Sequence, residues 1–135
     1  MKKIAVYITL IFVVAGCSPA SDRKVEQAQE SIRDDIKSQK DKVVKDLQTL
    51  RDDINDRLDN VSGKIENASD KSKVELESIK GDLIVARERV EKKLDEIDKS
   101  SDDTWDDIQQ SSRNTADDVT VEFEKLKQRM KEKLD

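Results

Sequence analysis

The feature that most constrains the fold is a narrow stripe of apolar residues that recurs at every third or fourth position of a highly charged chain. Side chains three and four residues apart lie on one face of an α-helix, so this spacing predicts amphipathic helices rather than strands. At some positions a polar residue such as Gln39 or Ser101 takes the place of an apolar one. With these positions counted, the stripe takes 30 steps from Val25 to Leu134, with a mean of about 3.63 residues, which is closer to the 11-residue repeat of 3.67 than to the heptad repeat of 3.5. The members of the stripe are Val25, Ala28, Ile32, Ile36, Val43, Leu47, Leu50, Ile54, Leu58, Val61, Ile65, Leu76, Ile79, Leu83, Ala86, Val90, Leu94, Ile97, Trp105, Ile108, Ala116, Val119, Phe123, Leu126, Met130 and Leu134.

Composition limits what this stripe can build. Charged residues make up 42% of the chain and aromatic residues only 3%, so a globular core of ordinary size is excluded. The chain is therefore either disordered or helical with one buried stripe, and the regular spacing favours helix. We expect an all-α fold in which long amphipathic helices form a coiled coil. An antiparallel hairpin or a three-helix bundle is the alternative.

The choice between these arrangements depends on where the helix breaks. Candidate breaks lie at residues 67–72, where Ser72 and Glu75 could form a capping box, and at Ser100-Ser101. Residues 111–115 form a third weak patch. An unbroken helix would have to cover its stripe with a second copy or another surface, whereas a chain that folds back at the breaks could cover the stripe itself.

The first sixteen residues have the layout of an export signal. Lys2 and Lys3 are followed by an apolar run from Ile4 to Val14, which at 11 residues is too short for a membrane-spanning helix of about 20. The next residues complete the sequence Val14-Ala15-Gly16-Cys17, which resembles the bacterial lipobox. We therefore expect a lipoprotein signal peptide at residues 1–16, a lipidated N-terminus with a short tether at residues 17–22, and a charged helical region at residues 23–135.

The lipobox resemblance implies a specific modification of Cys17, the only cysteine in the chain. The thiol would receive a diacylglycerol, the signal peptide would be cleaved between Gly16 and Cys17, and the new N-terminus would receive a further acyl chain such as palmitate. The expected location is the cell envelope, with the protein attached to a membrane by lipid. Ser18 rather than Asp after the cysteine favours the outer membrane, facing the periplasm, in a Gram-negative cell.

The C-terminal part resembles a widespread family of small bacterial coiled-coil proteins described as stress-response or apolipoprotein-like. The resemblance lies in residues 87–97, Ser100-Ser101 and Trp105-Asp106-Asp107-Ile108, which begins an 11-residue unit. The next unit begins with Ala116 in place of Trp, and Phe123 follows at the family's offset. The resemblance implies a helical envelope protein with a link to stress. We interpret Trp105 and Phe123 as packing anchors on the apolar stripe; for Trp105 a membrane-interface or partner contact is the less favoured interpretation.

The residue types argue against catalysis and metal binding. The chain has no histidine, and its one cysteine is assigned to lipidation, so the usual nucleophile pairs and zinc ligands are missing. Adjacent acids such as Asp106-Asp107 diverge by about 100° on a helix and do not converge on one ion. We expect no enzyme activity, no catalytic or metal-binding residue, no cofactor and no small-molecule substrate.

Charge also limits the partners. Cleavage before Cys17 would leave a net charge of −7, and the basic residues alternate with acids, so binding to nucleic acid or to anionic membranes through charge is disfavoured. The function we expect is a membrane-anchored lipoprotein with a structural or protein-interaction coiled coil, which forms a homo-oligomer or binds a helical partner. An apolipoprotein-like helix that binds lipid surfaces, or a desiccation and stress protectant, is the alternative.

Overall fold

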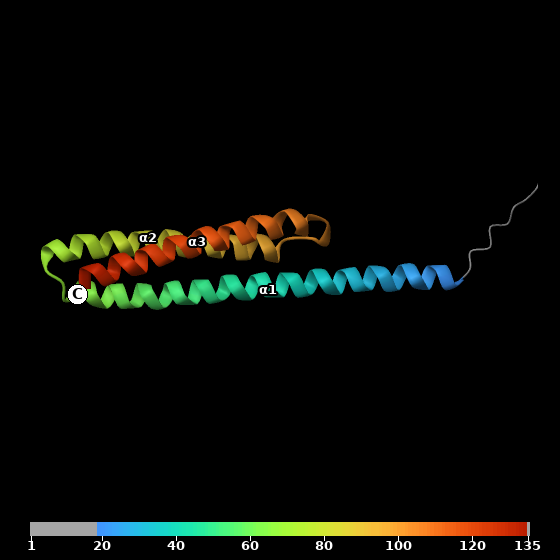
Figure 1. The fold of residues 1–135 in the computed structure, drawn as a ribbon, viewed down its shortest axis with the longest axis horizontal. Helices are drawn as coiled ribbons and strands as arrows, with labels where there is room; N and C mark the ends of the chain where they lie inside the picture. The colour runs from blue at the N-terminus through green and yellow to red at the C-terminus, as the bar shows by residue number, and fades with distance from the viewer. Residues whose placement is uncertain (1–18, 135) are drawn as a thin grey trace, which may run out of the picture. The chain divides into compact units, whose positions relative to one another are not determined.

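The structure is a computed structural model that describes residues 19–134. These residues form three α-helices and one short 3-10 turn: α1 (Pro19–Glu66), α2 (Asp70–Asp98), η1 (Asp102–Thr104) and α3 (Trp105–Leu134) (Figure 1). The described part of the chain contains no strand, so the all-α prediction is confirmed. The predicted signal peptide, Gly16 and Cys17 lie outside the described residues.

Helix α1 begins at Pro19, within the residues assigned to the tether. Proline is well suited to the first turn of a helix, since its φ is fixed near the helical value and its missing N–H is not needed there. Residues 19–22 are therefore helical.

The chain divides into two compact units, residues 1–32 and residues 33–135. In the first unit the described residues belong to the N-terminal part of α1. The side chains of Val25 and Ile32, both members of the predicted stripe, are each 58% exposed there. This segment is therefore helical, and no other described residues cover its apolar stripe.

In the second unit the rest of α1 packs with α2 and α3 as a three-helix bundle (Figure 1). The chain reverses direction twice, so neighbouring helices in the sequence are antiparallel and α1 and α3 run the same way. The sequence left an antiparallel hairpin and a three-helix bundle as alternatives to a self-paired coiled coil. Within this unit the structure is the three-helix bundle.

One apolar core joins the three helices of the bundle. All of its buried apolar side chains are members of the predicted stripe, which shows that the helical period located the core correctly. These side chains are Val43, Leu47, Leu50, Ile54, Leu58, Val61, Leu76, Ile79, Leu83, Ala86, Val90, Ile97, Trp105, Val119, Phe123, Leu126 and Met130.

The first reversal separates α1 from α2 at residues 67–69, inside the predicted break. Ser69, with extended backbone angles (φ −66°, ψ 157°), is the residue that precedes α2. The predicted capping box between Ser72 and Glu75 is wrong, because both residues lie inside the first turns of α2. The Ser72 hydroxyl accepts a hydrogen bond from Ser69, and the Glu75 carboxylate accepts one from Arg129 of α3.

The second reversal separates α2 from α3 and also lies where the sequence predicts it. Ser101 and Thr104 form a capping box around η1, in which the Ser101 backbone N–H donates to Thr104 Oγ1 at 3.2 Å. The third weak patch, residues 111–115, is not a break and continues α3. Helix propensity is a weak preference that tertiary packing overrides, and Ser112 in this patch is fully buried against the bundle.

Candidate functional site

Trp105 is the first residue of α3 and is fully buried. Its indole Nε1 donates to the side-chain oxygen of Gln39 on α1 at 3.4 Å, and Gln109 Nε2 donates to the same oxygen at 2.8 Å. The Lys40 ammonium lies 5.5 Å from the centre of the indole ring, within the range of a cation–π interaction. Trp105 therefore packs in the interior beside the second reversal, and its ring is not available to a membrane surface or to a partner.

Lys40 also holds the second reversal against α1. Its ammonium donates to the backbone oxygen of Ser100 and to the carboxylate of Asp102, each at 3.4 Å. These contacts hold the loop between α2 and α3 against the turn of α1 that contains Gln39, the hydrogen-bond partner of Trp105. The residues around Trp105 thus connect α1 to the second reversal and to the start of α3.

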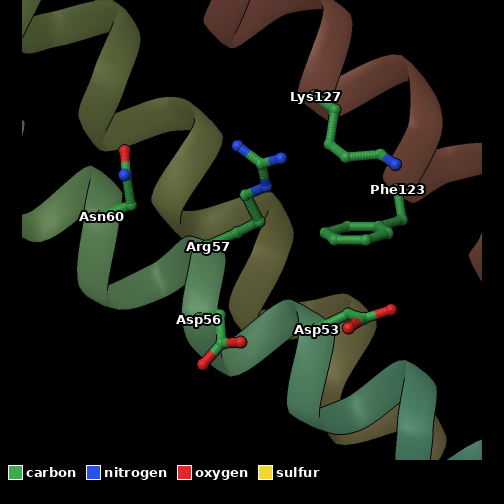
Figure 2. A pocket seen from close by; sticks show the side chains of 6 residues that line it. All are labelled: Asp53, Asp56, Arg57, Asn60, Phe123 and Lys127. Carbon is green, nitrogen blue, oxygen red and sulfur yellow. The ribbon is translucent and has the colours of Figure 1, made fainter.

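Phe123, the other predicted packing anchor, is 4% exposed and lies on α3. Its ring lines a hollow of about 400 Å³ between α1 and α3, and the Lys127 ammonium lies 5.1 Å from the ring centre. Arg57 of α1 and Lys127 of α3 also line this hollow (Figure 2). The other residues that line this hollow are Asp53, Asp56 and Asn60.

A second hollow of about 810 Å³ continues from the first and shares Arg57, Asn60 and Lys127 with it. We call the two together the α1–α3 groove. The first hollow is balanced in charge, with two acids and two cations, whereas the second is strongly basic. The second hollow is lined by Arg57, Asn60, Lys64, Thr120, Val121, Glu124, Lys125, Lys127, Gln128, Met130 and Lys131.

The neighbouring contact between α2 and α3 has a different charge pattern. Arg89 on α2 binds Glu122 on α3 at 2.8 Å, and Arg129 on α3 binds Glu75 at 2.9 Å and Asp82 at 3.0 Å on α2. The hydrogen bonds to Glu75 and then Asp82 raise the pKa of Arg129 above its ordinary value. Cations of each helix thus meet carboxylates of the other.

The α1–α3 groove lacks this pairing. Lys127 forms an ion pair with Glu124 on its own helix. With the carboxylates of the described residues, Arg57, Lys64, Lys125 and Lys131 form no ion pair. Two cations of α1 therefore face three of α3 across a groove whose basic half is lined, among the described residues, by one acid, Glu124.

Sequence reasoning did not find this groove. Along the chain every one of its cations has acids nearby, so the linear pattern reads as an alternating polar surface. The available signals were the seven-residue spacing of Arg57 and Lys64 and the four-residue spacing of Lys127 and Lys131, which place each pair on one helix face. The register of α1 against α3, which brings the pairs together, is a property of the tertiary structure.

The described residues offer neither a metal-binding group nor a membrane-spanning helix. Between residues 19 and 134, no three His, Cys, Asp or Glu side chains are grouped so that they could hold a metal ion. No helix in the same range is both long and apolar enough to cross a membrane. Among the protein families, curated proteins and solved structures with which the chain was compared, none matches it.

Proposed function

We propose that this chain is a lipid-anchored protein of the cell envelope whose helical bundle has a structural or protein-binding role. The observation that carries the proposal is the sequence Val14-Ala15-Gly16-Cys17 directly after a short apolar run. The lipid on Cys17 would hold the protein at a membrane, since each buried methylene contributes about 0.8 kcal/mol. Only Ser18 separates this cysteine from the first residue of α1.

A binding role rather than catalysis is supported by the kinds of residue present. Without histidine and with its single cysteine assigned to the anchor, the chain offers neither an imidazole as general base nor a free thiol as nucleophile. Its polar side chains in the bundle make ion pairs between and along helices, such as Arg129 with Glu75 and Lys93 with Glu96.

The lipid anchor is tested in bacterial cells that carry the lipoprotein processing enzymes. Wild-type protein should incorporate radiolabelled palmitate and fractionate with membranes, and globomycin, which blocks lipoprotein signal cleavage, should cause a larger precursor to accumulate. Cys17→Ser should abolish the label, whereas Ser18→Ala is the matched control that should keep it. Unchanged protein size under globomycin together with no palmitate label on the wild type would refute the anchor.

For the protein-binding role we propose self-association through the N-terminal part of α1. The support is the exposure of Val25 and Ile32, which lie with Ala28 on one face of that helix. Coverage of this face by a second copy would bury apolar surface, at about 25 cal/mol per Å².

Sedimentation equilibrium of residues 18–135, with circular dichroism on the same samples, tests this surface. We expect helical oligomers whose population falls on dilution and on the substitutions Val25→Ser and Ile32→Ser. Val74→Ser is the matched control, because Val74 is 71% exposed but lies off the stripe. A helical monomer at every concentration would rule out self-association and leave the lipid anchor untouched.

A further inference from the structure

We propose that the basic half of the α1–α3 groove binds a multivalent anion that carries phosphate groups. Five cations line this half: Arg57 and Lys64 from α1 and Lys125, Lys127 and Lys131 from α3. They come from two helices, so a ligand in the groove would be contacted from both sides. The inference is independent of the lipid anchor, because it uses only residues of the bundle.

The types of side chain suit phosphate. Arg57 offers a planar fork of N–H donors that can bind two oxygens of one phosphate group, and the lysines add compact positive charges. Lys127 is partly shielded from solvent, with its side chain 30% exposed, which strengthens its interaction with an anion relative to open water. Several cations within one hollow of about 810 Å³ favour a ligand with more than one negative charge.

The groove also has an apolar component. Val121, 53% exposed, and Met130, 2% exposed, line it beside the cations. A phosphate group attached to an organic carrier could place the carrier against these side chains. The phosphate of a lipid headgroup and a free phosphorylated solute share this chemistry.

The charges that line the groove support a binding role. Like charges that face each other across two packed helices destabilise the contact, and the α2–α3 contact shows that this bundle can pair its charges. A local arrangement that opposes folding is typical of functional sites, where binding supplies the compensating interaction. An anion in the groove would remove the repulsion, so binding and bundle stability should be coupled.

Compensation of helix dipoles is the alternative explanation for these cations. It accounts for Lys64 and Lys131, which lie in the last turns of α1 and α3, where a positive charge is favourable. The effect fades beyond the last turn. Arg57 and Lys127 lie further from the helix ends, so the dipoles do not account for them.

The net charge of −5 does not oppose binding at this place. At physiological ionic strength interactions between exposed charges are screened beyond about 8 Å, so a ligand in the groove interacts mainly with the side chains that line it. The local count of five cations and one acid therefore outweighs the overall balance.

The test is thermal unfolding of residues 18–135, which contain all of the described structure, followed by circular dichroism. Sodium pyrophosphate should raise the midpoint by about 4 °C or more beyond sodium chloride of equal ionic strength. The double variant Arg57→Gln/Lys127→Gln should lose this extra rise.

The matched control is Lys73→Gln/Lys92→Gln, which removes two exposed cations of α2 outside the groove. This variant should keep the full response to pyrophosphate. An equal rise in chloride and pyrophosphate for the wild type, or an equal pyrophosphate response in the groove variant, would overturn the proposal.

Vesicle flotation then identifies the source of the phosphate. If vesicles of phosphatidylglycerol, but not of phosphatidylcholine, carry the wild-type chain and release the groove variant, the ligand is a lipid headgroup. If pyrophosphate stabilises the wild type and neither vesicle binds it, the ligand is a free phosphorylated solute. Each of these outcomes supports the proposal, and neither depends on lipidation of Cys17.

Discussion

Gln39 and Trp105, which are 66 positions apart in the sequence, meet where the second reversal packs against α1: the indole Nε1 donates to the Gln39 side-chain oxygen at 3.4 Å. The spacing of the stripe assigns Gln39 to a polar position in an otherwise apolar series. The structure gives that position a role, because a buried indole N–H without an acceptor would carry a desolvation cost. One polar residue on α1 thereby fixes the position of the start of α3.

Replacement of Trp105 should be the most damaging single change in the bundle. Trp105→Ala removes a fully buried side chain and should lower the free energy of unfolding by about 3–5 kcal/mol. Gln39→Ala should cost only about 1 kcal/mol, because it removes an acceptor but leaves the ring packed. Urea unfolding followed by circular dichroism measures both, and a cost below that of Gln39→Ala for the tryptophan variant would contradict the buried position.

Arg129 should stabilise the contact between α2 and α3 in a salt-dependent way. Its guanidinium binds Glu75 and Asp82, but its side chain is 38% exposed, so we expect Arg129→Gln to cost only about 0.5–1 kcal/mol in low salt and less in 1 M salt. Arg113→Gln is the control and should be nearly neutral, because Arg113 is exposed and forms no ion pair with the described residues. Equal costs for the two variants would contradict a role for the cross-helix pairs.

The same contact predicts a pH profile. The pKa of Arg129 is raised in the folded state, so its stabilisation is complete below the ordinary pKa of an unfolded arginine and is lost only as the pH rises through the folded value. The difference in unfolding free energy between wild type and Arg129→Gln should therefore stay constant from about pH 6 to pH 10. Urea unfolding in low salt across this range checks it, and a steady decline towards pH 10 would count against the assignment.

Ser112 is a site where a substitution should stabilise the protein. Its hydroxyl is fully buried in α3 and has no hydrogen-bond partner among the described residues. Ser112→Ala removes an unpaired polar group and introduces a better helix former, so we expect a gain of about 1 kcal/mol in unfolding free energy. The adjacent Ser111→Ala is the control: its hydroxyl accepts a hydrogen bond from Lys93 at 2.6 Å, so it should bring no gain.

Gly81 offers a second stabilising change, through the backbone. It lies inside α2, its φ is not positive, and a Cβ atom added there would meet no atom within 4 Å. Gly81→Ala should raise the unfolding free energy by about 0.5–1 kcal/mol, because alanine loses less conformational entropy when the helix forms. Ser78→Ala, exposed in the same helix, should gain less than about 0.5 kcal/mol; a loss for Gly81→Ala in thermal unfolding would mean that the helix is strained at this position.

The two helix breaks illustrate how far local signals reach. Residues 67–72 and Ser100-Ser101 marked both reversals correctly, because serine, asparagine and aspartate compete with helical hydrogen bonds wherever they cluster. The same signals misplaced the capping box at Ser72 and predicted a weak patch at residues 111–115 that is helical. Those details depend on contacts with other helices, which no local rule contains.

By itself the sequence determined the helices, the apolar stripe and the residues of the core, because the period of apolar residues decides which face of a helix avoids water. Only the tertiary structure decided that α1, α2 and α3 share one core, that Gln39 meets Trp105, and that Arg57 and Lys64 face Lys127 and Lys131 across one groove. The reason is physical: periodicity sets the direction of a side chain around its own helix, whereas the register between helices follows from how their buried side chains pack together.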